Sequence, residues 1–323
     1  MLKSVARHDR GVAAIALPEN AVGTSIMTMG RLLKASFLFD RERWDEGLEL
    51  LERAVALDPD SAAARRELAM AFSNLGRMDE SLAENLRAVE LDPRNARGWY
   101  NLGVDLAVSD RPEEALKCFN QAVELDPDDA EYHNNLACML DAAGSLDDSL
   151  THSQTAIALA PGFALAHFNM GNTYANKQDW PEAIVCYGRA VEIDPEYRAA
   201  FTNMGIALGR LERWREAIAC HYRGVELEMD NGNCHYNLGV ALLNDGRIEA
   251  AIDCFGLAIG FDPTNADFFN NLALACFENG EHAEALSHFQ RALQLDPESE
   301  MIAANLAQAE AAMAATEHAI LAQ

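Results

Sequence analysis

The chain has 323 residues, of which 50% are hydrophobic and 24% are charged, a balance typical of a folded protein rather than a disordered one. Its 51 Asp and Glu against 25 Lys and Arg give a formal net charge of −26 at pH 7, which disfavours nucleic acid and anionic membrane surfaces as partners. No apolar run approaches the ~20 residues of a membrane span, so we expect no membrane insertion. Seven cysteines without a CxxC pair favour a reducing, cytoplasmic location.

Residues 1–27 precede the regular pattern that organises the rest of the chain. The basic residues Lys3, Arg7 and Arg10 come before a short apolar stretch, an order that resembles a secretory signal. The stretch is too short for a signal, and no convincing cleavage site follows it. We therefore predict an N-terminal extension that is either flexible or a cap for the first repeat. A third interpretation is that this segment occupies a groove of the repeats.

A ladder of prolines with a step of 34 residues runs along the chain, and Met229 occupies the single rung that lacks proline. Internal repetition with this period is typical of stacked helical repeats. With each proline counted as position 32, the predicted repeats are 28–61, 62–95, 96–129, 130–163, 164–197, 198–231, 232–265 and 266–299. A half-length unit, 300–323, follows. The rungs are Pro59, Pro93, Pro127, Pro161, Pro195, Pro263 and Pro297.

Each repeat is predicted to form two antiparallel helices, the first over positions 1–14 and the second ending at the Asp-Pro pair that most repeats carry. Small residues recur at positions 8, 20 and 27, where they allow the helices to approach closely. The unit 300–323 is predicted to be a C-terminal capping helix whose Ala303, Leu306 and Ala307 face repeat 8. Position 34 supplies the expected N-caps, which are Ser61, Asn95, Asp129, Asn231, Asn265 and Ser299. The expected turn glycines are Gly76, Gly144, Gly246 and Gly280.

The third repeat carries the fullest motif, which is Trp99, Leu102, Gly103 and Leu106, followed by Ala115, Phe119, Ala122 and Pro127. This pattern closely resembles the tetratricopeptide repeat (TPR) signature, and the phased copies extend the resemblance over residues 28–299. It implies an all-α fold, a right-handed α-solenoid superhelix of antiparallel helix pairs with a concave groove lined by the first helices. Lys34 stands where leucine is expected, so the first helix of repeat 1 is the least regular.

Position 6 of the first helix is asparagine in seven successive units. An asparagine amide offers two donors and one acceptor group, which pair with the main chain of an extended peptide whatever its side chains are. The row is similar to the asparagine ladder on the concave face of several TPR proteins, and that resemblance implies peptide binding. The alternative is that asparagine is simply common at this position in the family. The row is Asn101, Asn135, Asn169, Asn203, Asn237, Asn271 and Asn305.

Positions 5 and 9 flank this ladder and are expected to set specificity, because aromatic rings there could stack on a ligand. Aromatic side chains at position 5 also serve packing in such repeats. TPR domains that clamp acidic C-termini carry Lys and Arg at groove positions, where this chain has only Arg66 and Arg97. We therefore predict that the partner is a neutral or basic extended segment of a protein. The flanking residues are Tyr100, Asn134, Phe168, Asn172, Tyr236 and Asn270.

Cysteine or histidine occupies position 23 in six repeats, which raises the question of a metal site. Equivalent residues of stacked helix pairs should lie ~10 Å or more apart, too far to converge on zinc or to form disulfides. No nucleotide-binding, metalloprotease or nucleophile motif is present, so we predict no metal, no cofactor and no enzymatic activity. The position-23 residues are Cys118, His152, Cys186, Cys220, Cys254 and His288. The histidines at position 4, His133, His167 and His235, are interpreted as packing residues.

These features together favour a non-enzymatic protein-interaction scaffold that binds an extended segment of a partner through the asparagine ladder. Two alternatives remain open at this point. The stack could self-associate as a structural homo-oligomer, or it could serve as a regulatory or substrate-recruiting arm for an enzyme on another chain. Recognition through the main chain tolerates any side chains, so the sequence does not identify the partner.

Overall fold

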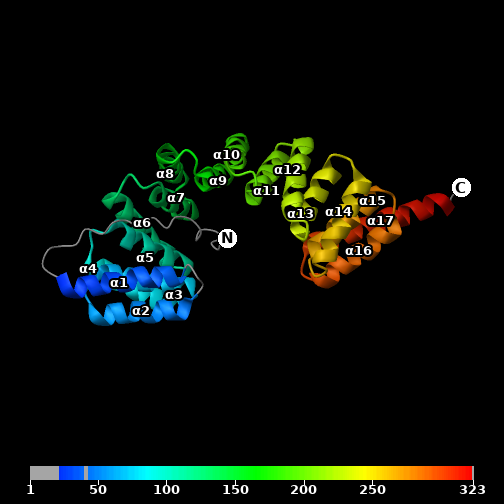
Figure 1. Ribbon diagram of the computed structural model, residues 1–323. Helices are drawn as coiled ribbons and strands as arrows, with labels where there is room; N and C mark the ends of the chain where they lie inside the picture. The colour runs from blue at the N-terminus through cyan, green and yellow to red at the C-terminus, as the bar shows by residue number, and fades with distance from the viewer. Residues whose placement is uncertain (1–21, 40–42, 322–323) are drawn as a thin grey trace. The chain divides into compact units, whose positions relative to one another are not determined.

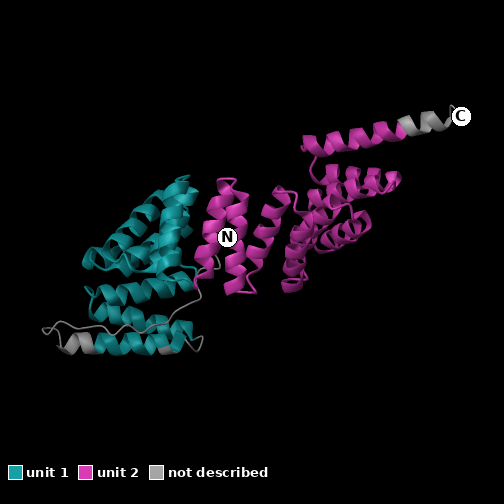
Figure 2. Ribbon diagram, turned by 90° about the horizontal axis from the view of Figure 1, so that it is seen from above, with its two compact units in different colours: residues 1–161 teal, residues 162–323 magenta. Residues whose placement is uncertain are grey.

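The computed structural model describes residues 22–39 and 43–321, and every regular element in that part of the chain is a helix (Figure 1). The helices fall into two compact units, residues 1–161 and 162–323 (Figure 2). Within each unit a helix packs mainly against the helices that precede and follow it in the chain. Each unit is therefore a linear, solenoid-like stack of helix pairs, and the prediction of an all-α solenoid is confirmed.

The helices follow the predicted repeats, with 13 residues in each first helix from α3 to α15 and 14 residues in each second helix. Unit 1 contains α1 (Val22–Phe39), α2 (Trp44–Leu57), α3 (Ala62–Asn74), α4 (Met78–Leu91), α5 (Ala96–Val108), α6 (Pro112–Leu125), α7 (Ala130–Ala142) and α8 (Leu146–Leu159). Unit 2 contains α9 (Ala164–Asn176), α10 (Trp180–Ile193), α11 (Arg198–Arg210), α12 (Trp214–Leu227), α13 (Gly232–Asn244), α14 (Ile248–Phe261), α15 (Ala266–Glu278), α16 (His282–Leu295) and α17 (Glu300–Leu321).

The first helix begins earlier than the repeat frame predicts. Helix α1 starts at Val22 instead of at residue 28, so the last part of the expected N-terminal extension is helical. The basic residues Lys3, Arg7 and Arg10 lie outside the described residues. The prediction that their segment occupies a groove therefore stays a prediction. The irregular Lys34 does not prevent the helix from forming, because its side chain is exposed while Ala35 beside it is buried.

All six predicted N-caps are confirmed. The side chain of Asn95 accepts a hydrogen bond from the main-chain N–H of Gly98 at 3.0 Å, and Asp129 accepts from Glu131 at 2.8 Å. These bonds satisfy donors that the first turn of a helix otherwise leaves unpaired. The other side chains that accept in this way are Ser61, Asn231, Asn265 and Ser299.

The turn between the two helices of a repeat uses a left-handed residue at position 15. The four predicted glycines, Gly76, Gly144, Gly246 and Gly280, have φ between 75° and 82° and are confirmed as turn residues. Three repeats place a residue other than glycine in the same conformation: Asp110 at 58°, Gln178 at 60° and Glu212 at 57°. A side chain strains this conformation, so these three turns are held by the packing of the helices on either side.

The two helices of a repeat cross at positions 8 and 24. A Cβ built on Gly103 would lie 2.9 Å from the ring of Phe119, closer than carbon atoms pack. The missing side chain therefore makes room for a buried ring on the facing helix. The same relation holds in every repeat with glycine at position 8: Gly103 faces Phe119, Gly171 faces Tyr187, Gly205 faces His221 and Gly239 faces Phe255.

The packing interpretation of the position-4 histidines is incomplete, because these side chains also bind the loop between repeats. Nε2 of His133 lies 3.0 Å from the carbonyl oxygen of Pro127. The indole N–H of Trp99 donates to the carbonyl of the preceding proline rung at 2.9 Å, and Nε2 of His235 lies 2.8 Å from that of Met229. Met229 stands where the other repeats have proline, and the hydrogen bond still forms because it uses the main-chain carbonyl.

A buried polar network separates two apolar clusters of unit 1. Oδ2 of Asp105 accepts hydrogen bonds from Oγ of Ser81 at 2.5 Å and from Nδ2 of Asn85 at 2.8 Å. Burial raises the pKa of this carboxyl, which is 2% exposed. Ser81 and Asn85 fall in sequence between the two clusters, of which one ends at Phe72 and the next begins at Val89.

The last helix, α17, packs against α16, but through other residues than expected. Ile302 and Ala309 are buried, Leu306 is half-buried, and Ala303 and Ala307 are exposed, so the prediction was wrong for these two alanines. In a complete repeat, position 8 is covered by the second helix of the same repeat. The described residues of this unit, 300–321, form one helix, and Ala307 at its position 8 is exposed.

Candidate binding surface

The position-6 asparagines all lie on first helices or on α17, and each is half-buried. The row divides between the units. Asn101 and Asn135 belong to unit 1, whereas the five from Asn169 to Asn305 belong to unit 2. Unit 2 therefore holds the longest ladder within one compact body.

Several ladder amides donate laterally to the preceding repeat. Nδ2 of Asn135 donates to the hydroxyl of Tyr100 at 3.3 Å and to the carbonyl of Glu131 at 2.9 Å. Asn271 repeats the arrangement, with the hydroxyl of Tyr236 at 3.0 Å and the main-chain carbonyl one turn earlier also at 3.0 Å. Both amide hydrogens are used in each case, which leaves the Oδ1 atom as the group that can accept from a ligand.

Two further lateral bonds join amide to amide. Nδ2 of Asn203 donates to Oδ1 of Asn172 at 2.9 Å, and Nδ2 of Asn305 donates to Oδ1 of Asn270 at 2.9 Å. Asn172 also accepts from the hydroxyl of Tyr187 at 2.9 Å, so its amide oxygen is shared between two neighbours. The predicted binding residues at positions 5, 6 and 9 are thus brought together, and part of their hydrogen-bonding capacity joins repeat to repeat.

Asn101 and Asn237 differ from these. Neither side chain makes a hydrogen bond to another residue in the described part of the chain. Their donors and acceptors are therefore available to water or to a ligand. Removing either amide would test ligand binding without breaking a lateral bond.

The aromatic residues at position 5 pack between repeats. Tyr100 is 7% exposed, and its ring centroid lies 5.0 Å from that of Tyr132. Tyr236 lies 5.0 Å from Phe268 in the same way. This placement favours the packing alternative over stacking on a ligand. The other predicted position-5 residues are Phe168, which is half-buried 4.9 Å from Tyr197, and the buried Asn134 and Asn270.

The charge of the first-helix face of unit 1 does not suit an acidic ligand. Nη1 of Arg97 forms an ion pair with Oε2 of Glu131 at 3.0 Å, so this cation is already compensated. Its guanidinium also lies over the rings of Tyr100 and Tyr132, at 5.3 and 5.6 Å. Glu67 occupies position 6 next to Arg66, and burial raises the pKa of this carboxyl.

Two histidines of repeat 4, whose pairing the sequence did not indicate, form a hydrogen bond. Nδ1 of His133 lies 2.9 Å from Nδ1 of His152. Because Nε2 of His133 contacts the carbonyl oxygen of Pro127, its proton sits on Nε2 and His152 is the donor. Burial and the neighbouring imidazole lower the pKa of His152. The bond joins α7 to α8.

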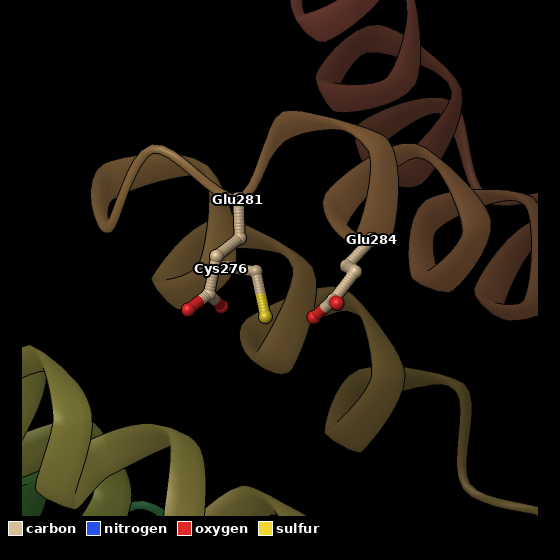
Figure 3. A group of neighbouring side chains, drawn as sticks. All are labelled: Cys276, Glu281 and Glu284. Atoms are coloured by element: carbon tan, nitrogen blue, oxygen red, sulfur yellow. The ribbon is translucent and has the colours of Figure 1, made fainter.

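A group of three side chains in repeat 8 is the only one in the described part of the chain with the spacing of metal ligands. Figure 3 shows the sulfur of Cys276 between the carboxylates of Glu281 and Glu284, with these ligand atoms within 4.8 Å of one another. Burial, together with Glu281, raises the pKa of the Cys276 thiol to about 11. A thiol must lose its proton to bind a metal, so this raised pKa makes metal binding less favourable at neutral pH. The position-23 residues are not part of the group.

The described helices include none with the length and apolar character required to span a membrane.

Three solved structures are similar to this chain in fold. The chain is 26% identical to YrrB, described as "a TPR protein with an unusual peptide-binding site", with a TM-score of 0.53 over 60% of this chain and 99% of that one. The Cut9–Hcn1 hetero-tetramer of APC/C gives 18% identity and a TM-score of 0.58 over 90% of this chain and 57% of that one. MamA of Desulfovibrio magneticus RS-1, from residue 41 to its end, gives 19% identity and a TM-score of 0.50 over 53% of this chain and 97% of that one. The last two show the fold alone.

Comparison with models of protein families identifies the family of this chain. Models described as "Tetratricopeptide repeat" match residues 32–96, 96–129, 118–151, 164–197, 202–266 and 236–300, which is most of the chain. A search of curated proteins found no match. The matched segments follow the same repeat frame that the proline ladder and the helix pairs define. The chain therefore belongs to the tetratricopeptide repeat family, a class of helical protein-interaction scaffolds.

Proposed function

We propose that the protein is a non-enzymatic scaffold that binds an extended segment of a partner protein along the asparagine ladder of unit 2. The observation that carries the proposal is the row Asn169, Asn203, Asn237, Asn271 and Asn305, one amide in each successive unit of a single compact body. Each amide of the row can pair with a main-chain group of an extended peptide whatever the side chains of that peptide are.

The lateral hydrogen bonds give these amides defined roles. Asn271 has used both donors, so its oxygen is available to accept from a peptide N–H. Asn237 makes no side-chain bond to described residues and can both donate and accept. The bonds also hold the amides in place before a ligand binds. Less side-chain conformational entropy is therefore lost on binding.

The chemistry of the surface supports a neutral or basic segment. Position 2 of the unit 2 repeats carries Leu165, Ala199, Asn233 and Asp267, none of which is a cation. The net charge of −26 attracts basic chains and repels acidic ones. The likeness to YrrB, whose description includes a peptide-binding site, supports peptide binding as the mode.

A peptide selection tests this proposal. A display library of random peptides, each about 12 residues long, would be selected on the full chain, and the affinity of the best peptide measured by calorimetry. Asn237→Ala should weaken binding by roughly fivefold to thirtyfold, because it removes one or two hydrogen bonds of about 1 kcal/mol each. Its unfolding midpoint should equal that of the wild type, because no lateral bond is lost.

Asn120→Ala is the matched control. Asn120 lies on the second helix α6, and its Nδ2 donates to the carbonyl of Leu116 just as ladder amides donate one turn back. This variant should bind the peptide as the wild type does. Equal affinity of Asn237→Ala and wild type, or a selection that yields only strongly acidic peptides, would contradict the proposal.

A further inference from the structure

A furrow of 550 Å³ lies between the second helices α14 and α16, with α15 as its floor. The floor residues Leu272 and Cys276 occupy positions 7 and 11 of α15. With 100° per residue, these positions lie about 100–160° around the helix from Asn271 of the ladder and from Asn270 beside it. The furrow is therefore a second surface of unit 2, separate from the proposed peptide site.

On α14, which forms one side of the furrow, repeat 7 lacks a charged pair that repeats 5 and 6 carry. At position 26 of repeats 5 and 6, arginine pairs with a glutamate one turn later, Arg189 with Glu192 at 2.6 Å and Arg223 with Glu226 at 2.5 Å. Repeat 7 has Leu257 and Gly260 at these places. Leu257 is 51% exposed, an apolar side chain where repeats 5 and 6 present a solvated ion pair.

Gly256 lines the furrow, and Gly260 lies one turn beyond it on the same helix. A Cβ built on Gly256 or on Gly260, one turn apart on α14, would meet nothing within 4 Å, so the main chain of this helix is bare. Cys276 stands at position 11, where the other repeats carry larger side chains. Those side chains are Leu38, Phe72, Leu106, Leu140, Tyr174, Leu208 and Leu242.

The rim of the furrow is acidic. Asp253 on α14 and Glu284 on α16 both line it, and both are exposed. His288 also lines it, and burial lowers the pKa of this imidazole, so it is uncharged at neutral pH. No lysine or arginine is among the lining residues. An apolar floor between carboxylates complements a segment that is apolar on one side and cationic on its flanks.

We propose that this furrow docks a basic amphipathic helix of a protein partner. Leucine-like side chains of that helix pack on Leu257 and Leu272, and its lysines or arginines pair with Asp253 and Glu284. The bare main chain at Gly256 and Gly260 lets the two helices approach closely. A second copy of this chain is a poor occupant, because each copy brings a net charge of −26 and the same acidic rim.

The test uses a synthetic helix of about 14 residues made only of leucine and lysine in a 3.6-residue period, with glutamate in place of lysine as the charge-reversed control. Binding to the full chain is measured by fluorescence anisotropy. We expect the lysine peptide to bind and the glutamate peptide not to bind. The double variant Leu257→Arg with Gly260→Glu rebuilds the ion pair of repeats 5 and 6 and should weaken lysine-peptide binding at least tenfold. Cys276→Leu, which fills the floor, should weaken it similarly.

Charge-matched variants separate docking from general attraction to an acidic protein. Asp253→Asn with Glu284→Gln should weaken binding at least tenfold, whereas Glu192→Gln with Glu226→Gln, which removes the same charge outside the furrow, should leave it within twofold. Asn237→Ala should have no effect, because the ladder is not involved. Equal loss in the two charge-matched variants, binding of the glutamate peptide, or no binding of either peptide would overturn the proposal. Dimerisation in light scattering that Leu257→Arg with Gly260→Glu abolishes would overturn it in favour of a second copy.

Discussion

At the scale of single residues, the contact between positions 8 and 24 determines how closely the two helices of a repeat approach. Phe119 is 1% exposed and fills the space that Gly103 leaves empty. The ring is enclosed, so it cannot swing away from an added methyl group. The glycine is therefore required by its neighbour and not by its own backbone conformation.

Gly103→Ala should destabilise the protein by about 1–2 kcal/mol, because the strain of an overpacked core exceeds the gain in helix propensity. The measurement is the free energy of unfolding in urea. The control is Gly188→Ala on α10, where an added Cβ would meet nothing within 4 Å. That variant should be neutral or more stable by up to about 1 kcal/mol. Equal stability of Gly103→Ala and wild type would mean that the helices adjust without cost.

His221 fills the same slot in repeat 6, and it introduces a dependence on pH. Burial lowers the pKa of this imidazole from 6.5 to about 4, because the charged form is poorly solvated there. The folded state therefore binds fewer protons than the unfolded state between these values. The contribution of neutral His221 to the free energy of unfolding is complete above pH 6.5. It is lost as the pH falls toward 4, by on the order of 3 kcal/mol in total.

His221→Phe should remove this loss, because phenylalanine already fills the slot opposite Gly103 and Gly239. The stability difference between His221→Phe and wild type should grow as the pH is lowered from about 7.5 to about 5. Urea unfolding at the two pH values measures it. A difference that is the same at both would show that His221 is solvated when the protein is folded.

At the scale of the helix pair, the turn at position 15 shows tertiary structure overriding local preference. Seven turns adopt a left-handed residue there, but only four supply glycine. The remaining three keep the conformation because the helices on both sides are already held by the neighbouring repeats. The strain is consequently stored in the turn, where a single substitution can release it.

Glu212→Gly should stabilise the protein by about 0.5–1 kcal/mol, because glycine adopts positive φ without steric cost. Gly246→Ala, at the equivalent turn of the next repeat, should destabilise it by a similar amount. Thermal unfolding of both variants under one condition is the measurement. Opposite shifts are expected, and a fall in stability for Glu212→Gly would show that the side chain contributes more than the strain costs.

At the scale of the whole molecule, the net charge of −26 opposes folding, because the compact states bring like charges together. Surface pairs such as Arg213 with Glu216 at 2.7 Å offset this only slightly, since ion pairs as exposed as this one contribute little to stability. The general repulsion should therefore exceed the loss of these pairs when salt is added.

Raising NaCl from about 20 mM to about 500 mM should increase the midpoint of thermal unfolding, because screening shortens the range of the repulsion. Potassium chloride serves as a control for ion-specific effects and should give the same shift. A midpoint that falls with added salt would mean that the Arg–Glu pairs contribute more than their exposure suggests.

Much of this architecture could be predicted because its signals are local. The period, the N-caps such as Asn95 and the turn glycines each depend on a few consecutive residues. The ladder was also predicted as a row, since one frame places the same position on the same side of each first helix. The exposed Ala303 and Ala307 were mispredicted because the frame of the full repeats was applied to a unit whose described residues form a single helix.

By itself the sequence determined the family, the helix boundaries from α2 onward to within a few residues, and the row of asparagines. Only the tertiary structure decided which of these amides are already bonded, that His133 pairs with His152, and that Asp105 is buried beneath Ser81. It also decided that Leu257 and Cys276, from different helices, line one furrow. The reason is physical: caps and turns depend on neighbours in sequence, whereas these contacts depend on how one repeat stacks on the next.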